Sequence, residues 1–260
     1  MTKAQYAAIF GAAILFLVLY LGFDRVNPNQ RSLEKSRKSN IESTGIDNLV
    51  KEAGEKLDSR QKSLIEALQM DLSKSGTDTI RKTELLKSLS GTWYDMGFPA
   101  ISGYYAEEIA TMQKTEESWS MAGTTYALCA KNANDDKTRN YCTGRAVKAF
   151  EKAISLAPEK IEPRLNLAIC YTDNPQQDNP MQGIMMLRDL NARYPDNVAV
   201  LNQLGRLAIQ TNQTEKALER LEKALSLEPE NNMTLCLLAK AYQMAGKADL
   251  AKEFELKCVD

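Results

Sequence analysis

Small and large apolar residues alternate with a fixed spacing in the second half of the chain. In TEKALERLEKALSLEPEN, residues 214–231, Ala217, Leu221 and Ala224 lie four and three residues apart, and Pro229 follows after five. This spacing places the three apolar residues on one face of a helix, which the proline ends. Small residues on either side of a large one indicate that a second helix packs closely against this face.

The same spacing occurs twice more upstream. The two further sets each end in proline and comprise Ala146, Phe150, Ala153 and Pro158, and Gly183, Leu187, Leu190 and Pro195. The three prolines are 37 and 34 residues apart. A period of this length is typical of a solenoid, in which each unit buries its apolar face only by stacking on its neighbours.

Each unit is predicted to consist of two antiparallel helices, helix A and then helix B. In residues 197–229, helix A carries Leu204 and Gly205, and helix B carries Leu221. We expect Gly205 to let helix B come close, while Leu204 and Leu221 fill the space between the helices.

These units resemble the tetratricopeptide repeat (TPR), a helix hairpin of about 34 residues. The unit that matches the family's order of residues best has Trp119, Ala122, Gly123, Tyr126, Ala146, Phe150, Ala153 and Pro158. The resemblance covers about residues 82–260. It implies an all-α solenoid of about four to five helix hairpins, which we assign to residues 81–260.

The N-terminus is predicted to be a membrane anchor. Residues 6–23 contain no charged side chain and would form a helix of roughly 27 Å, close to the thickness of a bilayer core. A cleaved signal peptide is the alternative, but no small-x-small cleavage site follows the run. We therefore expect a transmembrane anchor at residues 1–23 and a polar tether at residues 24–45.

An amphipathic helix is predicted between the tether and the solenoid, within residues 46–80. Its apolar stripe comprises Ile46, Val50, Ala53, Leu57, Leu64, Leu68 and Leu72. The stripe fits a coiled-coil seam between two chains. It equally fits a helix packed on the first repeat, or one interrupted near Gly54.

The last unit departs from the pattern at one position. Where Phe150, Leu187 and Leu221 supply the large residue of helix B, the last unit has Glu255. A carboxylate there fits an array that ends, with this helix facing water as a cap.

An insertion separates the helices of the Trp119 unit by eleven extra residues. It lies between Cys129 and Cys142, whose equivalents in the unextended unit flank the tight turn. We expect a disulfide that pins a polar loop at its base, with a stabilisation of roughly 3 kcal/mol. The alternative is two buried thiols. The remaining cysteines, Cys170, Cys236 and Cys258, are interpreted as core or groove residues.

Two signals disagree about the side of the membrane. A disulfide indicates an oxidising compartment, which would put the repeats outside the cytoplasm. Five Lys and Arg residues follow the anchor closely and only Lys3 precedes it, which favours cytoplasmic repeats. Because many single-pass repeat proteins that resemble this chain are arranged so, we expect the exterior, which in a bacterium is the periplasm.

The resemblance also implies a concave face, lined by the A helices, on which a protein partner docks. By register, the residues expected to face this groove are Asn166, Asn202, Arg206, Lys240 and Gln243. Asparagine and arginine side chains can hold a peptide backbone or a carboxylate.

Composition argues against several other classes of protein. The chain has no histidine, and its 33 basic and 34 acidic residues leave no surplus of charge for nucleic acid. It contains neither a glycine-rich phosphate loop nor a cluster with metal-ligand spacing. We therefore expect neither an enzyme nor a protein with a metal or cofactor.

The expected function is a membrane-anchored TPR scaffold that holds a protein partner at a membrane complex. The resemblance implies translocon-associated or envelope-assembly factors as examples. The alternative is a structural subunit that oligomerises through residues 46–72.

Overall fold

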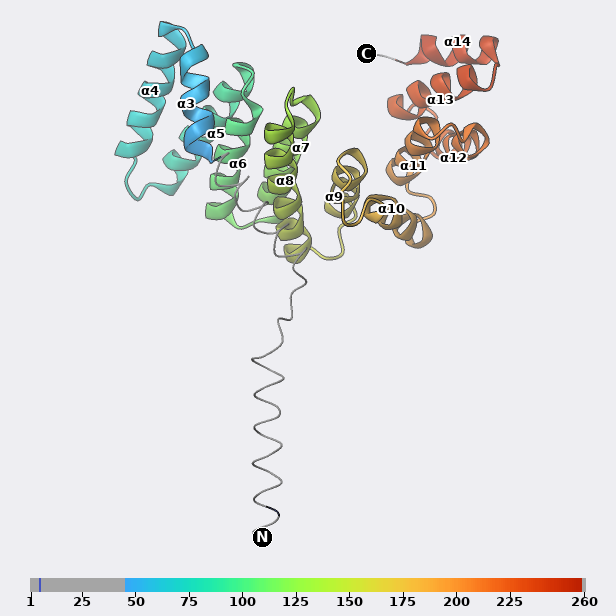
Figure 1. The fold of residues 1–260 in the computed structure, drawn as a ribbon, viewed down its shortest axis with the longest axis horizontal. Coiled ribbons are helices and arrows are strands. Elements are labelled where there is room, and N and C mark those ends of the chain that lie inside the picture. Colours follow the sequence, from blue (N-terminus) through green and yellow to red (C-terminus); the bar gives the residue numbers. More distant parts are fainter. Residues whose placement is uncertain (1–4, 6–44, 259–260) are drawn as a thin grey trace. The chain divides into compact units, whose positions relative to one another are not determined.

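The computed structural model describes residue 5 and residues 45–258, and these form twelve α-helices (Figure 1). The chain divides into two units, Met1–Asn48 and Leu49–Asp260, and the packing discussed below lies within the second. The predicted anchor at residues 6–23 and nearly all of the tether lie outside the described residues. Among the residues that are described, no helix combines the length and the apolar character needed to span a bilayer.

Ten of the helices pair into five hairpins of successive antiparallel helices, each packed on the next. Within the hairpins the first helix corresponds to helix A and the second to helix B. The pairs are α5 (Thr79–Asp95) with α6 (Pro99–Gln113), α7 (Glu116–Asn132) with α8 (Asp136–Leu156), α9 (Glu162–Asp173) with α10 (Gln182–Arg193), α11 (Val198–Gln210) with α12 (Thr214–Leu227), and α13 (Asn232–Met244) with α14 (Ala248–Lys257).

The segment predicted as one amphipathic helix is two helices, α3 (Ile46–Lys56) and α4 (Ser59–Lys74). The break has a local cause, because Asp58 and Gln61 form a capping box that starts α4: the Gln61 amide donates to the Asp58 carboxylate at 2.8 Å, and the Asp58 amide donates to the Gln61 side chain at 3.0 Å. The described residues therefore contain twelve helices, one more than the eleven that five hairpins and a single amphipathic helix would give.

The predicted apolar stripe is consequently divided between two helices. Leu57, in the break, is buried, whereas Leu64 on α4 is 47% exposed. The buried side chain of α4 is Ile65, and α4 packs against α5. The interpretation as a helix packed on the first repeat therefore describes α4, and the break after Lys56 agrees with the other alternative, an interruption near Gly54.

Close approach of the two helices in a hairpin depends on glycine, as predicted for Gly205. A methyl group added at Gly205 would lie 2.6 Å from Cδ2 of Leu221, and one added at Gly123 would lie 2.6 Å from the ring of Phe150. The small residues that flank Leu221, which are Ala217 and Ala224, are 0% exposed. The prediction that they are helix contact points is confirmed.

In the hairpin of α9 and α10 the glycine lies against backbone atoms of the facing helix. A methyl group added at Gly183 would lie 2.6 Å from the backbone nitrogen of Thr172 and 2.7 Å from the carbonyl oxygen of Ala168. In this hairpin the glycine faces the backbone of the partner helix as well as a side chain.

Three of the hairpins share one turn geometry. At the end of α5, α11 and α13, a residue with left-handed φ follows the last helical turn: Gly97 at 83°, Asn212 at 55° and Gly246 at 72°. In each case the next amide donates to a carbonyl five residues back, as Gln213 does to Ala208 at 2.8 Å. This is the Schellman motif, which satisfies carbonyls at the end of a helix.

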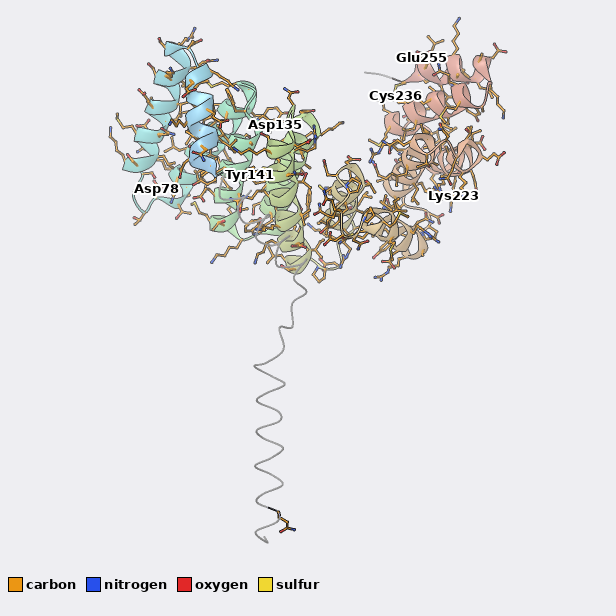
Figure 2. All side chains as sticks on the ribbon, viewed as in Figure 1. Asp78, Asp135, Tyr141, Lys223, Cys236 and Glu255 are labelled. Atoms are coloured by element: carbon orange, nitrogen blue, oxygen red, sulfur yellow. A yellow bond between two sulfur atoms is a disulfide. The ribbon has the colours of Figure 1, made fainter. Side chains whose placement is uncertain are left out.

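The eleven-residue insertion is helical, contrary to the polar loop that we predicted. It lengthens both helices, so that Cys129 lies in the last turns of α7 and Cys142 lies in α8. The turn is short and ends at Asp135, whose carboxylate accepts a hydrogen bond from the Thr138 amide at 2.8 Å (Figure 2). This N-cap starts α8 within the insertion, which explains why little loop remains.

Helices α7 and α8 are joined by a disulfide between Cys129 and Cys142. The sulfur atoms are 2.05 Å apart and the Cα atoms 5.9 Å apart. Because both cysteines are helical, the bond connects two facing helices and does not close the base of a loop.

A second disulfide closes the last hairpin. It joins Cys236, on α13, to Cys258, just after α14, with the Cα atoms 4.9 Å apart (Figure 2). The sequence interpretation of these two residues as core or groove cysteines did not include this bond, which forms because the start of helix A and the end of helix B meet in a hairpin. Glu255 is exposed, and Phe254 beside it stacks on Tyr242 with ring centroids 5.4 Å apart.

Candidate partner-binding surface

A small recess lies between two A helices, α7 and α9, and we call it the α7–α9 recess. Its volume is about 80 Å³. Phe150 and Cys170 are among the buried residues that contribute to its lining. Its polar and apolar walls come from the two A helices and include Thr124, Ala127, Lys131, Asn166, Ile169 and Asp173.

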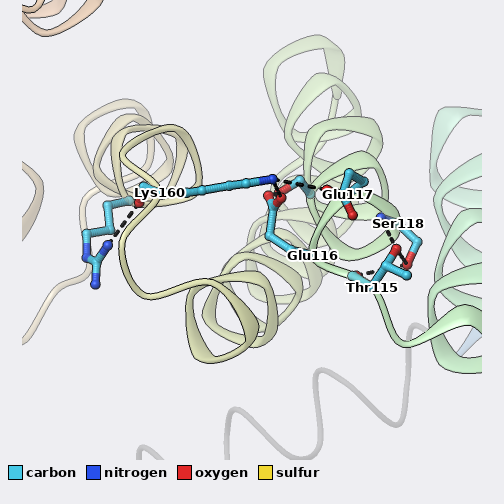
Figure 3. A network of polar contacts seen from close by, with 7 residues as sticks. Thr115, Glu116, Glu117, Ser118 and Lys160 are labelled. Carbon is cyan, nitrogen blue, oxygen red and sulfur yellow. Dashed lines mark hydrogen bonds and ion pairs between the residues drawn. The ribbon is translucent and has the colours of Figure 1, made fainter.

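An ion-pair cluster joins the two helices that carry this recess. Lys160, in the connection that leads to α9, pairs with Glu117 at 3.0 Å and also with Glu116, both in the first turn of α7 (Figure 3). The hydrogen bonds that the Lys160 ammonium donates to the Glu116 and Glu117 carboxylates raise the pKa of Lys160. Arg164 at the start of α9 donates to the Lys160 carbonyl at 2.9 Å. The cluster therefore links the start of α7 to the start of α9.

Arg206 extends this surface onto α11. Its guanidinium forms an ion pair with Asp173 at 2.8 Å, and its Nε donates to the side chain of Gln203 at 2.8 Å. Asp173 lines the recess together with Asn166, so the ion pair connects Arg206 to a residue of the recess wall. The charge of Asp173 is already compensated by Arg206.

Asn202 has a different environment from the other predicted binding residues. It is 1% exposed, and its side-chain oxygen accepts a hydrogen bond from the Thr234 hydroxyl at 3.0 Å. Its amide donates to Asn231, the N-cap of α13, at 3.3 Å. In this structure Asn202 joins α11 to α13 and has no surface to offer a partner.

The last two predicted residues, Lys240 and Gln243, are exposed on α13. Helix α13 packs against α11, so they continue the A-helix row beyond Arg206. The structure thus distributes Asn166, Arg206, Lys240 and Gln243 over three successive A helices, with Asn166 at the recess.

The recess is poorly suited to nucleophilic chemistry. Cys170 is the cysteine that remains outside the two disulfides, and burial, with a smaller contribution from the charge of Asp173, raises its pKa to about 12. Its thiol is therefore protonated at neutral pH, and a thiol is a much weaker nucleophile than a thiolate. Within residues 45–258 no cluster of three or more potential metal-ligating side chains occurs.

Sequence reasoning did not identify Lys131 and Asp173 as parts of this surface. Lys131 belongs to the insertion, which we interpreted as a loop. A signal was present, because Cys142, Ala146 and Ala149 keep helical spacing back into the insertion. Extending that spacing would have predicted longer helices and an additional turn of α7 beside the recess.

Comparison with known proteins agrees with this architecture. The family model described as tetratricopeptide repeat matches residues 198–231, which span α11, α12 and the turn that follows. No curated protein matches the chain significantly.

The fold is shared with solved structures of low sequence identity. A tetratricopeptide repeat protein from Parabacteroides merdae has a TM-score of 0.52 at 14% identity, over 86% of this chain and 78% of that one. A thermophilic TPR protein from Thermus thermophilus has a TM-score of 0.51 at 16% identity, over 68% and 89%. A MamA structure from Desulfovibrio magneticus superposes less closely, with a TM-score of 0.44 at 20% identity, over 68% and 92%. The chain therefore has a TPR-like all-α solenoid fold.

Proposed function

We propose that this chain is a membrane-anchored scaffold that holds a protein partner on its A-helix surface. The observation that carries the proposal is the α7–α9 recess, which lies between adjacent A helices and has Asn166 in its wall. Lys240 and Gln243 are exposed on α13, and we include them in the proposed surface. Translocon-associated and envelope-assembly complexes are the kinds of membrane complex that the resemblance to TPR proteins suggests.

A crosslinking experiment tests the partner-binding surface. A photo-crosslinking amino acid is placed at Gln243 or Asn166 in the full chain, expressed in its native membranes, and at Glu219 on α12 as a control. Glu219 is exposed on a B helix. We expect defined adducts with another protein from the two A-helix positions only. Equal adducts from Glu219 would contradict a binding role of the A-helix surface.

Anchoring through residues 6–23 is part of the proposal and is supported by the uncharged run in the sequence. Alkaline carbonate extraction of membranes checks it directly. We expect the full chain to stay in the membrane pellet and a variant lacking residues 1–23 to move to the supernatant. Release of the full chain by carbonate would contradict an integral anchor.

We further propose that the repeats lie on the oxidising side of the membrane. Two disulfides support this, because such bonds persist in oxidising compartments. Alkylation of the protein denatured in acid, before any reduction, should modify Cys170 alone. After reduction all five cysteines should react. Alkylation of all five without reduction would favour the cytoplasmic side indicated by the charge distribution.

A further inference from the structure

The α7–α9 recess is too small for a cofactor or a drug-sized ligand. Pockets for such molecules measure about 300–1,000 Å³, whereas this recess measures about 80 Å³. The recess has room for several water molecules or for one small group. A single small aliphatic side chain is a group of a size that the recess can hold.

The walls of the recess favour an apolar group. Ala127, Phe150 and Ile169 supply hydrocarbon surface, and the protonated thiol of Cys170 behaves as a small hydrophobe. Removing apolar surface from water on contact with these walls would stabilise a bound apolar side chain. Thr124 and Asn166, which also line the recess, place polar groups beside this apolar surface.

Among the described residues, one charge at the rim has no ion-pair partner. Asp173 is paired with Arg206, whereas Lys131 is exposed and forms no ion pair with another described residue. Within the described part of the chain, a positive charge therefore lies beside an apolar recess. A carboxylate next to the bound side chain would complement it.

We propose that the α7–α9 recess is a subsite for one small branched aliphatic side chain of the partner protein, next to an Asp or Glu that pairs with Lys131. This inference rests on the proposed scaffold function and adds the chemistry of the segment that binds. The occupant is a short extended stretch in which an acidic residue neighbours valine or leucine.

The test uses blocked pentapeptides Gly-Asp-Xaa-Asp-Gly as probes, with Xaa as valine, leucine, glycine or tryptophan. They are titrated into the full chain in detergent, and the methyl resonance of Ile169 reports binding. The methyl resonance of Ile209 on α11, outside the recess, is the control. We expect valine and leucine peptides to shift Ile169 and to bind at least tenfold more tightly than the glycine and tryptophan peptides. Equal binding of all four would overturn the subsite.

Two variants separate the apolar and the ionic contributions. Ala127→Leu fills the recess and should weaken the valine peptide about tenfold, whereas Ala239→Leu, at a similarly half-buried alanine on α13, should leave it unchanged. Lys131→Gln, at an exposed position that does not threaten folding, should weaken it about two- to fivefold. In the unaltered chain, replacing both aspartates of the valine peptide by asparagine should weaken binding, and Lys131→Gln should abolish this difference.

The outcomes distinguish this inference from the scaffold function. Adducts from Gln243 and Asn166 together with no discrimination among the four peptides would overturn the subsite and leave the scaffold standing. An unchanged peptide affinity in both Ala127→Leu and Lys131→Gln would place the peptide elsewhere and overturn the subsite as well. Absence of adducts would count against the scaffold itself.

Discussion

The hairpins α7/α8 and α11/α12 pack their two helices together in the same way, although the helices differ in length. In both, a glycine of helix A faces a large side chain of helix B, Gly123 against Phe150 and Gly205 against Leu221. The helices of the first pair have 17 and 21 residues, and those of the second have 13 and 14. The contact between helices is therefore independent of the length of the helices beyond it.

The two hairpins differ most at their turns. The α11/α12 turn is a Schellman motif with Asn212 in the left-handed region, and no side chain caps α12. The α7/α8 turn has an extended C-cap and relies on the side chain of Asp135, together with the disulfide. An insertion can thus lengthen a hairpin without disturbing its neighbours, provided that new local interactions replace the original turn.

The largest loss of stability is expected when the large side chains opposite the two glycines are shortened. We expect Phe150→Ala to lower the free energy of unfolding by about 3–5 kcal/mol and Leu221→Ala by about 2–5 kcal/mol, because each leaves a cavity in the core. Gly123→Ala should be tolerated better when combined with Phe150→Ala, since the added methyl then enters empty space. Urea denaturation of the single and double variants measures the coupling. Additive effects would contradict a close contact between Gly123 and Phe150.

Removing the disulfide should affect only the longer hairpin. Replacing both Cys129 and Cys142 by serine should lower the free energy of unfolding by roughly 3 kcal/mol in the chain-entropy model. Repeat arrays transmit stability mainly between neighbours, so amide exchange should rise in α7 and α8 and stay low in α11 and α12. Hydrogen exchange by mass spectrometry checks this, and an equal rise in both hairpins would refute a local effect.

The N-caps of α8 and α12 provide a contrast with a smaller expected effect on stability. Asp135→Ala removes a side-chain N-cap and should cost about 1 kcal/mol. The matched change Gln213→Ala lies at the corresponding position of α12, where no side chain caps the helix, and should change stability by less than half as much. Thermal denaturation of the two variants decides the point, and losses of equal size would show that the Asp135 hydrogen bond contributes little.

The smallest expected difference in stability between the two hairpins is the one produced by low pH. The hydrogen bond from the Thr138 backbone amide holds the pKa of Asp135 below its usual value. A lowered pKa stabilises the folded state above the ordinary carboxyl range, and this stabilisation is lost as the pH falls through the folded-state pKa. The start of α8 should therefore fray below about pH 4, the ordinary carboxyl pKa. An Asp135→Asn variant keeps a neutral cap and should show less fraying in amide exchange at low pH.

The regular part of the fold could be predicted because it rests on repeated local chemistry. The spacing of Ala217, Leu221 and Ala224 specified a helix face, and Gly205 specified how closely the partner helix comes. The capping box at Asp58 was also visible in the sequence, but a continuous apolar stripe suggested one helix. A strong local cap outweighed a stripe that is only partly buried.

The candidate surface was less predictable, because burial depends on contacts between hairpins. Asn202 has the register of a groove residue, yet Thr234 and Asn231 of the next hairpin surround it. Lys131 lies beside the recess because the insertion extends α7 as a helix. The Cys236–Cys258 bond likewise depends on two chain segments that meet only after α13 and α14 pair.

The backbone contact at Gly183 has a consequence for how such a chain can change over generations. Opposite Gly123 and Gly205 the facing side chain is exchangeable, as phenylalanine and leucine in the two hairpins demonstrate. Opposite Gly183 lie main-chain atoms of α9, which every amino acid shares, so no compensating replacement across the contact makes room for a methyl group. Mutational drift should therefore be permitted at positions 150 and 221 and blocked at position 183.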